Sequence, residues 1–209
     1  GQCFSSSDGG LNFTPLAQAD TNISDCILTG SEAGSPTLYV ALDQAGTWKL
    51  WRSDDAGVSF VNPYTLGGFY GTLCASSVLP NVVVWGNIEA HRSVDSGATF
   101  TVVNSWSSYY GNPAHRLHAD LFGFDVLVDP ANPNGEVFCF GTDGGLYKSL
   151  DSGATVQNLC LQGLGVSQYY STLTSKTTPT LILAGAQDQG YQRGNYVPPT
   201  ASDPRLRSI

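Results

Sequence analysis

The sequence predicts an all-β fold made of repeated four-stranded antiparallel units, and three observations support this. An eight-residue pattern, Ser-x-Asp-x-Gly-x-(Thr/Ser/Asn)-Phe, starts at residues 6, 53 and 93, and a copy that ends in Val starts at residue 149. The copies therefore begin 47, 40 and 56 residues apart, a spacing typical of propellers and other repeat folds. The 24 Gly and 11 Pro, with only 12% charged residues, favour turns over helices. Together they indicate a β-propeller.

The repeated motif predicts a tight turn between two strands, with a structural role for its Asp. The carboxylate can accept hydrogen bonds from N–H groups of the turn, and the Gly allows a positive φ. The Phe is then expected to start the next strand and to point into the core. The predicted turn residues are Ser6, Asp8, Gly10, Ser53, Asp55, Gly57, Ser93, Asp95, Gly97, Ser149, Asp151 and Gly153.

Between the motifs the sequence predicts three complete blades, at about 25–62, 71–104 and 122–161. Short runs rich in β-branched and aromatic residues, bounded by turn residues, mark their strands. The expected strands are 25–30, 37–42, 48–52 and 59–62 in the first blade, 71–78, 82–86, 88–92 and 99–104 in the second, and 124–128, 136–141, 146–149 and 155–161 in the third.

The two ends of the chain predict complementary half-blades, 1–16 with strands 2–6 and 12–16, and 168–195 with strands 168–174 and 180–186. Two outcomes follow, because complementary halves can cover each other's edges. The chain either closes alone as a four-bladed ring or forms an arc of a larger propeller that a second chain or another segment completes. The irregular tail 196–209, which contains no strand pattern, favours the arc.

Charge and composition restrict the partners. The net charge of −8 and the absence of a Lys/Arg cluster argue against nucleic acid and against membrane insertion or an anionic membrane surface. The composition suggests a secreted or cell-surface protein. Five cysteines lack C-x-x-C spacing, so neither a metal nor another cofactor is expected. Cys139 and Cys160 fall in neighbouring predicted strands and could form a disulfide; the alternative is buried free thiols.

Several longer stretches carry a resemblance to a known family. They are His118-Ala-Asp-Leu, Asp129-Pro-Ala-Asn-Pro-Asn, Gly141-Thr-Asp-Gly-Gly-Leu-Tyr-Lys-Ser, Gln162-Gly-Leu-Gly-Val-Ser-Gln-Tyr-Tyr and Gly185-Ala-Gln-Asp-Gln-Gly. With the repeated motif, they are similar to the Asp-box, or BNR, repeats of secreted bacterial glycosyl-hydrolase-like, sialidase-like, sortilin-like and xyloglucanase-like propellers. The resemblance implies the propeller fold. Activity has to be argued from the site, because one fold hosts many functions.

Blade geometry predicts where a site would lie. If the motifs join the third and fourth strands at one end of each blade, the second-to-third turns and the inter-blade loops emerge at the other end. Polar side chains on such loops are the default binding-site candidates. The residues expected there are Asp43, Gln44, Asn87, Asp143, Gln187, Asp188, His115, Arg116, His118 and Asp120.

Two pairs of residues in this predicted site could have specific roles. His118 and Asp120 lie two residues apart, so on an extended segment they would share a face and could hold a cation or a polar ligand. A second His often follows in related proteins, but Phe122 stands there, which weakens a metal site. Asp143 and Asp188 occupy turns rich in Gly and Gln, so each could be a turn former instead of an acid or base.

An insertion around residues 104–115 exposes Trp106, Tyr109 and Tyr110 among small polar residues. Flat aromatic rings suit stacking on sugars or packing against a protein. The alternative is that they fold down as caps between blades. Phe69 and Tyr70 occur in a similar connection, which supports an aromatic rim.

Three functional classes follow. A sialidase is disfavoured because only Arg116 and Arg193 lie outside the motifs and the tail. A xyloglucanase-like glycoside hydrolase would need paired carboxylates, for which Asp143, Asp188 and Asp120 are the candidates. An interaction module for a glycan or an extracellular protein requires no further residues and is favoured. Its predicted binding residues are Trp106, Tyr109, Tyr110, His118, Asp120, Gln187 and Asp188.

Overall fold

The structure is a computed structural model that describes residues 2–19, 23–34, 36–68, 70–132, 134–162, 169–178, 180–187 and 190–195. The chain divides into two compact units, Gly1–Gly165 and Val166–Ile209. Asp188, Phe69 and the predicted tail 196–209 lie outside the described residues. No helix in the described part is long and apolar enough to cross a membrane.

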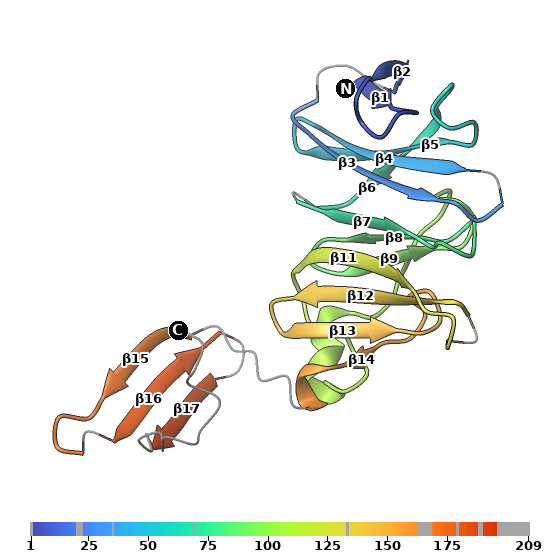
Figure 1. Cartoon of the computed structure of the whole chain (residues 1–209). Coiled ribbons are helices and arrows are strands. Elements are labelled where there is room, and N and C mark those ends of the chain that lie inside the picture. The colour runs from blue at the N-terminus through green and yellow to red at the C-terminus, as the bar shows by residue number, and fades with distance from the viewer. Residues whose placement is uncertain are drawn as a thin grey trace. The chain divides into compact units, whose positions relative to one another are not determined.

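Three sheets of the first unit are β-propeller blades, in which each strand pairs antiparallel with the next one in the chain (Figure 1). The first blade comprises β3 (Asp25–Ser31), β4 (Thr37–Gln44), β5 (Thr47–Ser53) and β6 (Val61–Leu66). The second comprises β7 (Thr72–Ala75), β8 (Val83–Gly86), β9 (Ala90–Ser93) and β10 (Thr101–Val102). The third comprises β11 (Leu121–Val128), β12 (Glu136–Thr142), β13 (Gly145–Ser149) and β14 (Gln157–Asn158). These sheets confirm the predicted all-β fold of four-stranded blades.

The ends of the chain form two smaller sheets. β1 (Gln2–Ser5) pairs with β2 (Thr14–Gln18), and Ala17 N donates to Gly57 O of the first blade at 3.0 Å. The second unit contains β15 (Tyr169–Thr174), β16 (Leu181–Ala186) and β17 (Gly190–Asn195). The sequence predicts only two strands there. β17 has two Gly and no apolar alternation, yet it pairs with β16 in continuous register.

The repeated motif forms the same hydrogen-bonded turn in all four copies. In the second blade, Ser93 Oγ donates to Asp95 Oδ1 at 2.7 Å and accepts Gly97 N–H at 2.8 Å. Thr99 donates its N–H to Asp95 Oδ1 at 2.8 Å and its hydroxyl to Asp95 Oδ2 at 2.6 Å. The copies at residues 6, 53 and 149 repeat these bonds. Gly97 has φ +83°, and a Cβ there would lie 2.7 Å from Leu50 Cδ2.

The fourth strand of each blade begins later than the sequence predicts. The predicted starts were residues 59, 99 and 155, whereas β6, β10 and β14 begin at Val61, Thr101 and Gln157. The physical reason is that Ser59, Thr99 and Thr155 donate both N–H and hydroxyl groups to the motif carboxylates. They therefore belong to the turn, and sheet pairing starts two residues further on.

These turns predict a pH dependence of stability. Hydrogen bonds from Asn12, Ser59 and Thr99 lower the pKa values of Asp8, Asp55 and Asp95, respectively, from 3.8 to about 2. Because the folded-state pKa is the lower one, the stabilisation is fully present above pH 3.8 and is lost as the pH falls through about 2.

We expect the urea concentration at the unfolding midpoint to decrease as the pH is lowered from about 4 to about 2. Asp95→Asn should make this decrease smaller. The control is Asp25→Asn, at an exposed carboxylate outside the motifs. An unchanged pH profile in Asp95→Asn would contradict the expectation.

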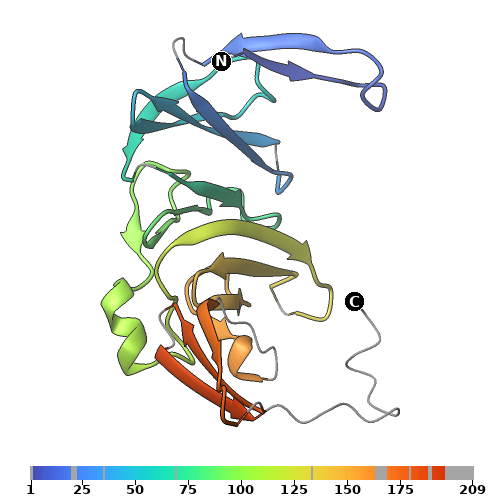
Figure 2. The ribbon, with the colours of Figure 1, turned by 90° about the vertical axis from the view of Figure 1, so that its left-hand side faces the viewer.

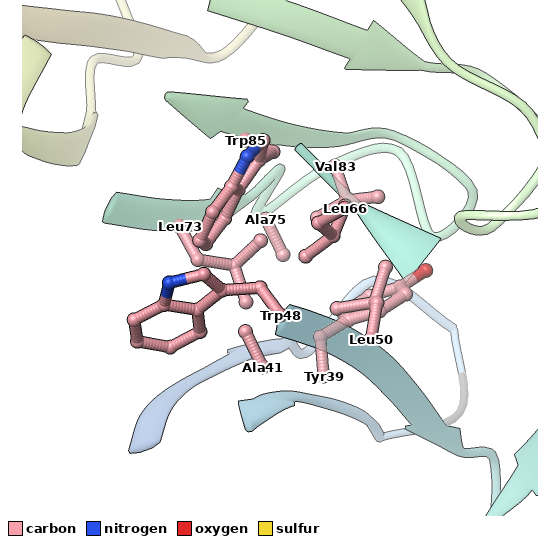
Figure 3. Close-up of a cluster of buried hydrophobic side chains, with 9 residues drawn as sticks. All are labelled: Tyr39, Ala41, Trp48, Leu50, Leu66, Leu73, Ala75, Val83 and Trp85. Atoms are coloured by element: carbon pink, nitrogen blue, oxygen red, sulfur yellow. The ribbon is translucent and has the colours of Figure 1, made fainter. Parts of the chain in front are cut away.

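Neighbouring blades of the first unit pack face to face (Figures 1 and 2). Between the first and second blades lies a core of nine buried residues that includes Trp48 and Trp85 (Figure 3). A second core between the second and third blades is built around Phe138, Phe140 and Tyr147. The last motif residue was predicted to point into the core. Phe100 packs against the first core and Val156 belongs to the second, as predicted, whereas Phe13 is 63% exposed and the prediction is wrong for the first copy.

Of the two alternatives for Cys139 and Cys160, the structure has free thiols and not a disulfide. All five cysteines have free thiols. Cys139 lies on β12 opposite Lys148, whereas Cys160 lies in a 3-10 turn, η2 (Cys160–Gln162), and not in a strand. The Cys160 sulfur accepts the N–H of Leu146 at 3.2 Å. The two thiols therefore belong to different parts of the blade.

Candidate functional site

The site is built from loops at the end of the blades opposite the motif turns. In each blade the second and third strands are joined at the pairs Gln44–Thr47, Gly86–Ala90 and Thr142–Gly145. The motif turns follow the other end of the third strand. The expected separation of motif turns and site loops is therefore present within each blade.

The centre of the site is the segment 117–122, which enters the third blade. Asp120 N donates to Ile88 O at 3.1 Å, and Leu121 N donates to Asn87 O at 2.7 Å. Asp143 N donates to Asp120 O at 3.2 Å. The backbone of Asp120 is thus held between the β8–β9 turn of the second blade and the β12–β13 turn of the third.

Asp120 presents a carboxylate with a fixed phenol donor. Tyr70 Oη donates to Asp120 Oδ1 at 2.7 Å, and the Tyr70 ring stacks on Phe122 with centroids 5.6 Å apart. Burial raises the pKa of the Tyr70 phenol, and so do the hydrogen bond to Asp120 and the charges of Asp120 and Asp143. The phenol therefore remains protonated at neutral pH and acts as a donor.

His118 and Asp120 do not form the shared face that the sequence predicts. Asp120 has φ +60°, which interrupts the alternation of an extended segment. His118 is 5% exposed, its Nδ1 lies 3.1 Å from Ala119 O, and its ring meets Tyr109 edge-on with centroids 4.7 Å apart. A Cβ on Gly144 would lie 2.5 Å from His118 Cβ, so the β12–β13 turn needs glycine where His118 covers it. Over the described ranges, no group of three or more His, Cys, Asp or Glu could hold a metal ion.

The insertion forms a 3-10 helix, η1 (Trp106–Gly111). Glu89 Oε1 accepts Trp106 N–H at 2.9 Å and so anchors its start to the β8–β9 turn. Trp106 and Tyr110 are 47% and 58% exposed and meet edge-on at 6.3 Å, while Tyr109 is half-buried against His118. Two of the three predicted aromatics are thus surface rings, and the third supports them.

Aromatic rings pack at both ends of the segment from His118 to Phe122. One group is on η1 and touches His118; the other is the Tyr70–Phe122 stack, in which Phe122 is 65% exposed. We name these rings the aromatic surface, consisting of Tyr70, Trp106, Tyr109, Tyr110 and Phe122. Sequence reasoning gave Phe122 no binding role and did not pair Tyr70 with Asp120. The sequence did carry one indication of this role. Tyr70 lies in an aromatic loop between two blades, as do the rings of η1.

The other predicted site residues either lie outside the aromatic surface or have structural roles. Asp43 accepts Ser24 Oγ at 2.6 Å and Gly46 N at 2.9 Å, and Asn87 Nδ2 donates to Gly67 O at 2.7 Å, so both brace loops. His115 and Arg116 line a separate cavity with residues of the fourth motif, which starts at residue 149. Gln187 belongs to the second unit, where it accepts a hydrogen bond from the Tyr170 hydroxyl. Of the three catalytic candidates, the structure brings Asp120 and Asp143 together, and Asp188 lies outside the described residues.

The three successive blades and the loop surface at their ends define the class of protein: a β-propeller-blade protein with a loop-borne aromatic surface. No family model matches the chain, and no curated protein matches it either. Among solved structures, the GH74 enzyme of Niastella koreensis is 16% identical over 77% of this chain and 26% of its own, with a TM-score of 0.46. The structure of YCF48 bound to D1 peptide is 14% identical over 97% of this chain and 87% of its own, with a TM-score of 0.38. This chain thus spans about a quarter of the GH74 enzyme, and its function has to be argued from its own site.

Proposed function

We propose that this chain is a binding module whose ligand is a neutral glycan. The observation that carries the proposal is the aromatic surface. Trp106, Tyr110 and Phe122 are 47%, 58% and 65% exposed, and other aromatic rings pack against each of them. Fixed, exposed aromatic rings are typical of binding surfaces, because they offer a large contact area with few torsions to immobilise.

The polar groups beside these rings favour sugar hydroxyls. The Asp120 carboxylate is an acceptor for hydroxyl donors, and hydrogen bonds to a charged acceptor are stronger than neutral ones. Asp120, Asp143 and Glu89 also make this part of the surface acidic, which disfavours acidic sugars. The proposal includes the secreted or cell-surface location expected from composition, where glycans are exposed. A protein partner, the other ligand class expected from the sequence, is an outcome of the test.

A glycan array tests the proposal with the full chain. Trp106→Ala and Phe122→Ala are each expected to weaken binding to any neutral glycan hit by about tenfold, because each removes one stacking ring. Phe13→Ala is the matched control, since Phe13 is 63% exposed against 65% for Phe122 and belongs to the first motif turn. Isothermal titration would measure the affinities. No bound glycan, or equal losses in Phe13→Ala and Phe122→Ala, would reject the proposal in favour of another ligand class.

A glycoside hydrolase is the second candidate, supported by the contact between Asp120 and Asp143. The two residues share a backbone hydrogen bond, and both charges act on the Tyr70 phenol. Glycoside hydrolysis needs such a pair of carboxyl groups, one as acid and one as base or nucleophile. The same glycan mixtures would be assayed for new reducing ends. Turnover that Asp143→Asn reduces by about 100-fold or more would favour the hydrolase, whereas binding without turnover favours the module.

A further inference from the structure

A cavity of about 560 Å³ lies between the outer strands of the second and third blades. Val103 and Asn104 follow β10 on one side, Lys148 and Gln157 come from β13 and β14 on the other, and Arg116 comes from the loop after η1. Its volume falls within the roughly 300–1,000 Å³ of small-molecule sites. It is separate from the aromatic surface, whose rings are not among its lining residues.

The charge of this cavity is opposite to that of the chain. His115, Arg116 and Lys148 all line it, and no Asp or Glu does, although the chain carries a net charge of −8. Across the described ranges the one ion pair is Arg52–Asp54, so neither Arg116 nor Lys148 is neutralised by a carboxylate. Arg116 is exposed and Lys148 is partly buried. Two unpaired cations therefore face one concave space.

Asp151, in the fourth motif turn, accepts hydrogen bonds from Ser149 and from the N–H and hydroxyl of Thr155. These bonds hold its carboxylate within the turn. The opposite end of η1 is held by Glu89, which accepts Trp106 N–H. Within the part of the chain that the structure describes, neither carboxylate forms an ion pair with Arg116 or Lys148, so both cations can bind an outside anion.

The cavity also has an apolar side. Val156 is buried in the core between the second and third blades, and the partly buried Val103 packs against that core. A ligand with a ring or short carbon body could cover these valines while its charged group meets Arg116 and Lys148. Guanidinium groups bind planar oxyanions in a bidentate manner, and lysine adds a point charge.

We propose that this cavity binds a small organic anion through a carboxylate or sulfate group held by Arg116 and Lys148. His115 lies at the same cavity and adds a further donor. This cavity shares no lining residue with the aromatic surface, so the chain would have a second site, which prefers anions where the first prefers a neutral glycan.

Titration calorimetry with the full chain would test the proposal, with glucuronate and glucose 6-sulfate as probes and glucose as the neutral analogue. We expect at least one anion to bind with a Kd of about 1 mM or tighter at low ionic strength, and glucose not to bind. Raising the salt to about 0.5 M should weaken binding severalfold, since salt screens exposed charges. The two anionic arms show whether a carboxylate or a sulfate is preferred.

Substitutions locate the anion. Arg116→Gln and Lys148→Gln should each weaken binding by about fivefold to tenfold, and Lys148→Arg should retain most of it. Lys176→Gln changes the net charge equally at an exposed lysine in the second unit and should have no effect. Binding of glucose as strong as that of both anions, no binding of either anion, or equal losses in Lys176→Gln and Arg116→Gln would overturn the proposal. Trp106→Ala should leave anion binding unchanged, which separates this result from the glycan test.

Discussion

Replacing Trp85 by alanine is expected to lower the free energy of unfolding by about 4 kcal/mol, the largest single effect in the chain. Trp85 lies on β8, is 1% exposed and packs against Trp48 with ring centroids 5.3 Å apart. Its indole N–H donates to Gly67 O at 3.0 Å. The substitution removes one of the two tryptophans of the core between the first and second blades (Figure 3). It is expected to leave a cavity, because the packed sheets can relax only in part.

Urea unfolding of the full chain would measure this change. Trp106→Ala is the matched control, because it removes the same side chain from a position that is 47% exposed, and it should change stability by less than about 1 kcal/mol. Trp85→Phe should cost less than Trp85→Ala, since it retains a ring but loses the bond to Gly67. A loss below about 2 kcal/mol in Trp85→Ala would mean that the two blades do not depend on this core.

Glu136→Ala is expected to lower the free energy of unfolding by about 3 kcal/mol, because it removes a buried carboxylate that joins the second and third blades. Glu136 begins β12 and is 0% exposed. Its Oε1 accepts the hydroxyls of Ser76 and Ser152 at 2.6 and 2.5 Å. Its Oε2 accepts the N–H and the hydroxyl of Ser77 at 2.8 and 3.0 Å.

Four donors therefore lose their acceptor in Glu136→Ala, and a buried donor without a partner costs more than the bond itself contributed. Glu136→Gln keeps one oxygen and should cost about half as much. Glu32→Ala, at an exposed glutamate that follows β3, is the control and should be nearly neutral. Equal unfolding midpoints for Glu136→Ala and Glu32→Ala would show that the carboxylate does not hold the blades together.

Local chemistry made most of the fold predictable. Motif residues such as Ser93, Asp95 and Gly97 bond within a few positions of one another, so their turn could be expected from the spacing alone. The predicted strand boundaries were less accurate, because a residue such as Thr99 can belong either to a strand or to a turn. Both of its donors go to Asp95, and the strand starts later. β17 was missed because its pairing with β16 depends on the partner and not on its own pattern.

The candidate site was predictable in its location but not in its contacts. Trp106 and Tyr110 were expected to be exposed because they lie in an insertion rich in small polar residues, and they are. The inward position of His118 was not expected. The sequence indicated an extended segment and gave no sign of the positive φ of Asp120. That backbone conformation depends on the bonds to Ile88 and Asp143.

The sequence by itself determined the repeat, the turn chemistry and the end of each blade at which site loops emerge, because these depend on residues close together in the chain. Only the tertiary structure decided which polar groups meet. Tyr70 reaches Asp120 across 50 residues, and Ser77 reaches Glu136 across 59. Many hydroxyls and carboxylates in this chain could pair, and the choice among them is made by the packing of one blade on the next.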